Sequence, residues 1–443
     1  MALLSHLHHA PHSCFPKNWT ATEDWFSKRL QRLNHPTVID RPLNPALQDF
    51  QALIENDPDI YMCFHMMFEQ VPHISLYSVD PGLGHPQVRG QHKRIFRIMI
   101  CDHLKVRDYK TMLKLFNVII TEAPDYEADN VFVAFPINAI LNWPMGTDAG
   151  IAAFLNPKVN AEFKKIFDVW SNFLTSPDSR YVLTTEDNGW FGPAASEAMP
   201  DFAATYVCDP KASYHGFKSW DDFFTRTFRP GVRPVESPDD DTVVNCACES
   251  RIYCIASDVK TVDQFWLKGE CYSLKHMLNN DPFTPLFAGG TVFQAFLAAT
   301  KYHRWHSPIN GVVVKIVMVP GTYYAASPAM GFRNPAGPDP SAQNSSQSFL
   351  TAVATRALIF LRSNNPGIGL MCFMAVGMAE VSTCEVMVKE GQRIKKGEQL
   401  GMFHFGGSTH CLIFRPETKI TFNANYPVDA DVPINVSLAT VSR

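Results

Sequence analysis

The hydrophobic pattern of this chain changes near residue 206, and the change limits the folds that it can adopt. Before residue 206, apolar residues recur at helical spacing over 44–71, 108–122 and 156–174. After it, short β-branched or apolar stretches bounded by Gly, Pro or Asn predict strands. These strands are expected at 251–256, 312–319, 357–361, 370–376, 383–388 and 411–414. Helices followed by strands, without regular alternation, predict an α+β fold with a mainly antiparallel sheet.

We expect two domains, a helical N-terminal accessory domain over residues 1–205 and a catalytic domain over 206–443. A chain of 443 residues is long enough to hold both and to bury a large core. Ser219 and Asp222 resemble a capping box that opens a helix over 220–228. Residues 325–348 are rich in Pro, Gly, Ser and Asn and too long for an ordinary connection, which leaves a lid and a disordered segment as alternatives.

The charge balance excludes several classes of partner. The 39 Lys and Arg nearly offset the 43 Asp and Glu, so no basic surface for nucleic acid or anionic lipid is expected. The longest apolar run, 369–381, is shorter than the roughly 20 residues that span a bilayer. The first 13 residues contain His and Pro where a secretory signal needs an apolar core, and 11 cysteines in apolar segments suit a reducing compartment. We expect a cytoplasmic protein with a small-molecule substrate and no membrane span; the oligomeric state stays open.

Three segments carry side chains with catalytic chemistry. Ser408 follows two glycines, in a near match to a nucleophile elbow that has His410 in place of the last glycine. His303 and His306 precede a turn, and Glu249 lies between apolar stretches. Each also has an ordinary structural interpretation, as a turn, a surface histidine pair or a salt-bridged glutamate. Together they supply the hydroxyl, imidazole and carboxylate of a serine, histidine and acid relay. The common nucleotide and zinc motifs are absent, so no metal site is expected.

The order of several motifs in the second half resembles the phosphatidylserine decarboxylase family, whose members are pyruvoyl enzymes made by self-cleavage. The motifs are FFTR at 223–226 with RPGVRP at 229–234, KGE at 268–270 with YSL at 272–274, YHRWH at 302–306, and GE and LG within 397–401 before GGST at 406–409. Longer phrases, among them YSLKHMLNNDPFTP from 272 and LGMFHFGGS from 400, are similar to the L-tryptophan decarboxylases of that family. That branch uses the fold on a free aromatic amino acid.

The resemblance implies a self-cleavage between Gly407 and Ser408. Ser408 would attack the Gly407 carbonyl, and the chain would divide into residues 1–407 and 408–443, which stay associated. The serine would become the pyruvoyl cofactor, which would hold the substrate's amino group and act as electron sink. No added cofactor would be needed.

The resemblance also implies roles for the other candidates. His306 maps to the base for the cleavage, Glu249 to its orienting acid, and His303 to the histidine tied to decarboxylation. The family usually has Asp followed by Gly where this chain has Glu249 and Ser250, so the carboxylate is one methylene longer and its role is less certain.

We therefore expect a pyruvoyl-dependent carboxy-lyase that converts a free aromatic L-amino acid, L-tryptophan first, to its amine. A peripheral or soluble phosphatidylserine decarboxylase and an uncleaved, non-catalytic paralogue are the alternatives. A biotinyl or lipoyl carrier is a third, because residues 388–407 resemble such hairpins, but no suitably flanked lysine is present.

Overall fold

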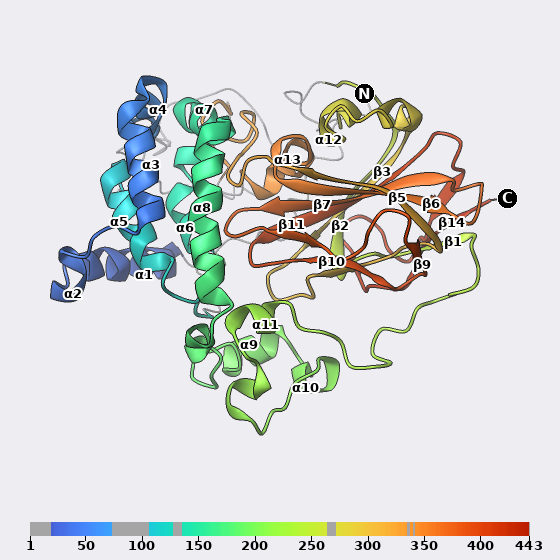
Figure 1. The fold of residues 1–443 in the computed structure, drawn as a ribbon, viewed down its shortest axis with the longest axis horizontal. Coiled ribbons are helices and arrows are strands. Elements are labelled where there is room, and N and C mark those ends of the chain that lie inside the picture. Colours follow the sequence, from blue (N-terminus) through green and yellow to red (C-terminus); the bar gives the residue numbers. More distant parts are fainter. Residues whose placement is uncertain are drawn as a thin grey trace, which may run out of the picture.

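The computed structural model describes residues 19–72, 106–126, 135–263, 272–334, 337–339 and 342–442. Within these ranges helices dominate before residue 206 and strands after it (Figure 1), which confirms the α+β class. The motif at 268–270 and the first 13 residues lie outside the described ranges. Over those ranges, no helix has both the length and the apolar character needed to cross a membrane.

Several helices of the first half begin where the sequence supplies capping side chains. The side chains of Asn44, Asp57, Asp108 and Asn156 each accept a hydrogen bond from a backbone N–H of the first turn. Asp57 ends one helix and opens the next, so the stretch 44–71 forms two helices. The helices are α1 (Trp19–Leu33), α2 (Pro36–Ile39), α3 (Pro45–Asn56), α4 (Pro58–Glu69), α5 (Tyr109–Ile119), α6 (Pro136–Leu141), α7 (Asp148–Leu155), α8 (Pro157–Leu174), α9 (Pro193–Ala198), α10 (Phe202–Thr205), α11 (Trp220–Phe224), α12 (Leu274–Met277) and α13 (Gln347–Val353).

The second half is built on an antiparallel sheet with the strand order β13-β2-β3-β11-β7-β6-β5-β9. Its strands are β2 (Ser250–Val259), β3 (Gly290–Leu297), β5 (Gly311–Val319), β6 (Arg356–Ser363), β7 (Leu370–Met378), β9 (Arg393–Ile394), β11 (Gly407–Phe414) and β13 (Asp431–Val432). Two small sheets flank it, β1-β14-β12 and β4-β10-β8. Their strands are β1 (Val243–Asn245), β4 (Arg304–His306), β8 (Cys384–Val386), β10 (Gln399–Phe403), β12 (Ile420–Phe422) and β14 (Ser437–Val441). The six predicted strands are thus confirmed.

Alternating side chains of β11 enter different cores. Leu412 and Phe414 pack in one apolar cluster, while Cys411 and Ile413 pack in another. This is the two-residue period of a strand that is buried on both faces.

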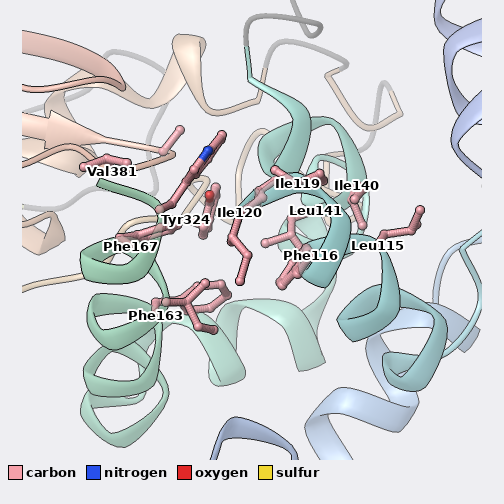
Figure 2. Packing of buried hydrophobic residues seen from close by; sticks show 14 of the residues in the cluster. Leu115, Phe116, Ile119, Ile120, Ile140, Leu141, Phe163, Phe167, Tyr324 and Val381 are labelled. Atoms are coloured by element: carbon pink, nitrogen blue, oxygen red, sulfur yellow. The ribbon is translucent and has the colours of Figure 1, made fainter. Parts of the chain in front are cut away.

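A third cluster joins the helices to one end of the sheet. Figure 2 shows Val381, from the turn after β7, and Tyr324 beside Phe163 and Phe167 of α8. Phe405, just before β11, belongs to the same cluster. The start of β11 therefore lies against the helical half of the chain.

The helix expected over 220–228 is shorter than predicted. Ser219 Oγ accepts from the backbone N–H of Asp222 at 3.0 Å, as the capping box required, but α11 ends at Phe224. Phe228 instead forms a backbone bridge with Tyr206, which draws the chain into an extended conformation.

The described part of the segment 325–348 packs against the helices. Ala326 and Ala342 are buried in the helical cluster, and the backbone N–H of Phe332 donates to the Gly146 carbonyl at 2.9 Å. The segment then leads directly into α13.

Candidate active site

Ser408 lies at the start of β11, between β3 and β7, where it faces Leu297 and Gly377 in the ladder. It is only 3% exposed, and its hydroxyl has no hydrogen-bond partner among the described residues. A buried hydroxyl without a partner destabilises a fold.

The backbone before Ser408 is held against a strained turn. Gly406 has a φ of 148°, and a Cβ built there would lie 2.5 Å from the Ser382 Oγ. Ala379, Glu380 and Ser382 in that turn have φ values of 55°, 21° and 41°. Non-glycine residues tolerate such values only when the surroundings enforce them. Only glycine fits at position 406.

The imidazole of His306 is mostly buried on β4. Its Nε2 lies 2.9 Å from the hydroxyl of Tyr302, and its Nδ1 makes no hydrogen bond of normal geometry. Burial, aided by the charge of Arg304, lowers the pKa of His306 to about 4. The ring is therefore neutral at physiological pH and can accept a proton.

His303 is fully buried and stacks on Phe224, with 4.0 Å between the ring centroids. Neither ring nitrogen makes a hydrogen bond of normal geometry. Burial, aided by the charge of Arg226, lowers the pKa of His303 to about 3. The ring is therefore neutral at physiological pH.

The chain around α11 holds the histidine segment in place. The buried guanidinium of Arg226 donates to the carbonyls of Thr300 at 2.6 Å and Lys301 at 2.9 Å. Arg304 donates in return to the Thr225 carbonyl at 2.6 Å. Two arginines thus fix both sides of His303.

Glu249 is buried in a two-point ion pair with Arg233, at 2.7 Å and 3.1 Å. Its Oε2 also accepts from the backbone N–H of Ile434 at 2.9 Å. It makes no hydrogen bond with His306, whose ring contacts Tyr302 instead. The role of Glu249 as orienting acid therefore stays a prediction.

Known proteins place these residues in a family. A profile described as phosphatidylserine decarboxylase matches residues 220–432, and a second with that description matches 44–199. Decarboxylase iboD of Amanita muscaria is 46% identical over 320 residues, which cover 70% of this chain and 91% of the relative. The chain belongs to the phosphatidylserine decarboxylase family. It is accordingly a decarboxylase.

Other relatives of this decarboxylase carry more specific names. The L-tryptophan decarboxylase of Psilocybe cubensis is 38% identical over 395 residues, covering 85% of this chain and 82% of the relative. Phosphatidylserine decarboxylase proenzyme 2 of Oryza sativa subsp. japonica is 28% identical over 238 residues, covering 53% of this chain and 36% of the relative. The sequence identity to the L-tryptophan decarboxylase is thus higher than to the phosphatidylserine enzyme, and it extends over more of this chain.

The residues of this decarboxylase fit the pyruvoyl group that the family implies. That group is made from a serine and needs a backbone carbonyl approached closely by its hydroxyl. Ser408 supplies a buried hydroxyl that has no partner in the described part of the chain, and Gly406 gives a backbone that no other residue could adopt beside Ser382. His306 supplies a neutral imidazole at the end of β4.

Sequence reasoning missed several polar residues around the decarboxylase site. The amide of Gln294 donates to the Thr409 hydroxyl at 3.1 Å and accepts from the Tyr272 hydroxyl at 2.7 Å, so the residue after Ser408 is fixed by a buried network. Tyr302 lies within the motif at 302–306, but that motif does not indicate a role for its hydroxyl. Nothing in a single sequence signals that Gln294 is a network member.

Two further ionisable groups flank the segment before Ser408, His404 in the chain itself and Glu380 in the turn that contacts Gly406. His404 contacts the carboxylates of Asp221 at 2.9 Å and Glu385 at 2.7 Å; burial opposes its charge, but the two carboxylates outweigh burial and raise its pKa to about 9. Glu380 is fully buried in the strained turn, where burial raises its pKa to about 8. Its Oε1 accepts from the backbone N–H of Asn138 at the start of α6.

Proposed function

We propose that this decarboxylase acts on a free aromatic L-amino acid, L-tryptophan first, and makes its own pyruvoyl group by cleavage between Gly407 and Ser408. The observation that carries the proposal is the buried, unpartnered hydroxyl of Ser408 beside a glycine backbone held by Ser382. We also keep residues 1–205 and 206–443 as the proposed accessory and catalytic domains.

In the proposed cleavage, His306 takes the proton of the Ser408 hydroxyl. The Oγ attacks the Gly407 carbonyl carbon, and the acyl group moves from nitrogen to oxygen. Elimination of the resulting ester leaves Gly407 as a carboxylate, and hydrolysis releases the former amide nitrogen as ammonia. For the first of these steps, Nε2–H of His306 donates to the Tyr302 hydroxyl, which helps to fix the imidazole and leaves the lone pair of Nδ1 to take the proton.

Strand pairing would hold the two proposed fragments together. Residues 408–414 pair with β3 on one side and β7 on the other, and β14 pairs with β1. Cleavage before Ser408 breaks one covalent bond and leaves these ladders intact.

The pyruvoyl group supplies a ketone that withdraws the electron pair left by departing CO2. His303 is the residue proposed to donate a proton to the carbon that loses CO2. It is neutral in its apolar surroundings, and a substrate carboxylate beside it would raise its pKa. Substrate binding would thus favour protonation of His303, which supplies the proton that the reaction consumes.

The aromatic substrate is supported by the relatives' names and by the coverage of the match. The L-tryptophan decarboxylases of Psilocybe cubensis and Psilocybe cyanescens match 85% and 84% of this chain, whereas the rice phosphatidylserine enzyme matches 53%. Phosphatidylserine is the alternative substrate, so a test must compare activity on it with activity on aromatic amino acids.

The test combines intact mass with a substrate panel. The purified enzyme should contain a small fragment that begins at position 408 and lacks an amino group. It should release amine from tryptophan, tyrosine or phenylalanine. Activity on phosphatidylserine alone would refute the aromatic substrate, and full activity of an uncleaved chain would refute the self-cleavage.

A further inference from the structure

Phe405 lies three residues before Ser408, and four aromatic rings surround its side chain. Trp220, Trp170 and Phe224 present their edges or faces at 4.5, 5.5 and 5.6 Å between centroids, with interplanar angles of 78°, 88° and 88°. Phe135 stacks parallel to it at 5.7 Å. We call Phe135, Trp170, Trp220 and Phe224 the aromatic cage. It leaves Phe405 only 1% exposed.

The cage shares a wall with the candidate active site. Phe224 packs against Phe405 and also stacks on His303, the histidine proposed to handle the substrate's proton. A ring inside the cage therefore lies one side chain away from His303 and three residues from Ser408.

The cage has one polar group that Phe405 does not satisfy. The indole N–H of Trp220 is fully buried and has no hydrogen-bond partner among the described residues. A buried indole N–H usually has an acceptor. A phenyl ring offers none, so packing of Phe405 alone does not account for a tryptophan at this position.

The connection of Phe405 to the fold changes when the chain is cleaved. On its N-terminal side, His404 is fixed by Asp221 and Glu385. On its C-terminal side, the covalent link to Ser408 anchors it to β11. Cleavage removes that second anchor. Residues 405–407 become a tail whose last two members are glycines; the backbone N–H of Ser382 donates to the Phe405 carbonyl at 2.7 Å, and Gly407 pairs with Met378 of β7.

We propose that the aromatic cage binds the aromatic side chain of the substrate, and that Phe405 fills the cage until self-cleavage frees its end of the chain. This inference rests on the proposed function and adds the side-chain site to it. The ligand class is a flat, apolar ring on a free amino acid, of phenyl, phenol or indole type. Cleavage would then open the substrate site in the same event that makes the pyruvoyl group.

The first test changes the cage in the cleaved enzyme. Phe135→Leu and Trp170→Leu should still be cleaved but should raise the KM for L-tryptophan about tenfold, with a smaller effect on kcat. Phe135 is half-buried, so its variant keeps the test open if Trp170→Leu fails to fold. The matched control is Phe64→Leu, a buried ring of the helical core whose ring contacts are Phe50 and Phe154. Cage variants that are cleaved and match this control in KM would overturn the inference.

The second test uses the uncleaved chain and indole as the probe. Ser408→Ala should keep Phe405 in the cage and show no indole binding by calorimetry. Ser408→Ala with Phe405→Ala should bind indole, because an apolar cavity of that shape stays dry and takes an aromatic ligand. Equal binding by both proteins, or by neither, would overturn the inference.

The two proposals fail differently. If the wild-type chain is uncleaved or turns over no aromatic amino acid, the proposed function fails. If the wild-type chain is cleaved and active on L-tryptophan but the cage variants match Phe64→Leu, only the cage assignment fails.

Discussion

The hydroxyl of Tyr302 lies 2.9 Å from Nε2 of His306, at a position four residues away in the same motif. The ring of Phe228 stacks on Tyr302 at 4.2 Å, so the tyrosine itself is fixed by packing. In this structure a phenol, and not the carboxylate of Glu249, is the group in contact with the imidazole proposed to start the cleavage.

Removing that phenol should slow the maturation of the enzyme without stopping it. Tyr302→Phe keeps the packing on Phe228 and loses one hydrogen bond, which is worth roughly 1 kcal/mol or up to about tenfold in rate. Gel electrophoresis of freshly translated protein would follow the cleavage with time. Tyr181→Phe, which loses two hydrogen bonds to the Ala123 backbone in the helical half, is the control and should mature at the normal rate.

The two histidines of the YHRWH motif should separate maturation from turnover. His306→Ala should remain a single inactive chain, because the proposed base is missing. His303→Ala should be cleaved but lose most decarboxylation, by roughly 100-fold or more. Gel analysis and amine release measure the two properties on one preparation. An uncleaved His303→Ala chain that folds normally would contradict this division of roles.

Gly406, the residue before the proposed cleavage pair Gly407 and Ser408, should tolerate no side chain. Gly406→Ala places a Cβ 2.5 Å from the Ser382 Oγ at a φ of 148°, so the turn must shift and the cleavage should slow by roughly 100-fold. Gly391→Ala separates strain from contact, since Gly391 also has a positive φ of 81° but no atom within 4 Å of the added Cβ. That control should lose some thermal stability yet mature normally.

His404 should make stability depend on alkaline pH. Its folded-state pKa of about 9 lies above the ordinary value of 6.5, so its ion pairs contribute fully below pH 6.5 and are lost as the pH rises through 9. The difference corresponds to about 3 kcal/mol at most. Thermal unfolding of the wild type and His404→Gln should differ most near pH 6 and converge near pH 9.5. A constant difference across this range would show that packing, not charge, is lost.

The hydrophobic pattern predicted much of the fold because its signals are local. Capping residues such as Asn156 and the alternation around Leu412 act within a few residues of where they lie. The predicted helix after Ser219 is longer than the observed one. Its end depends on the bridge between Tyr206 and Phe228, a contact that no local pattern reveals.

The candidate site was predictable in its components but not in its contacts. Ser408, His303 and His306 stood in recognisable motifs, whereas the partner of each depends on the folded sheet. Glu249 pairs with Arg233, 16 residues upstream, and His404 pairs with Asp221, 183 residues away. Phe405 carries no ionisable or hydrogen-bonding side-chain group that would mark it in the sequence. Its enclosure by the aromatic cage could therefore be seen only in the structure.

The central claim is that the chain cuts its own backbone before Ser408, and intact mass spectrometry of the catalytically active protein tests it most directly. Two polypeptides are expected, residues 1–407 with a normal C-terminal carboxylate and residues 408–443 with a pyruvoyl group in place of the N-terminal serine. Ser408→Ala, purified in parallel, should have one mass and no activity. An active preparation with only the mass of the complete 443-residue chain would contradict the account.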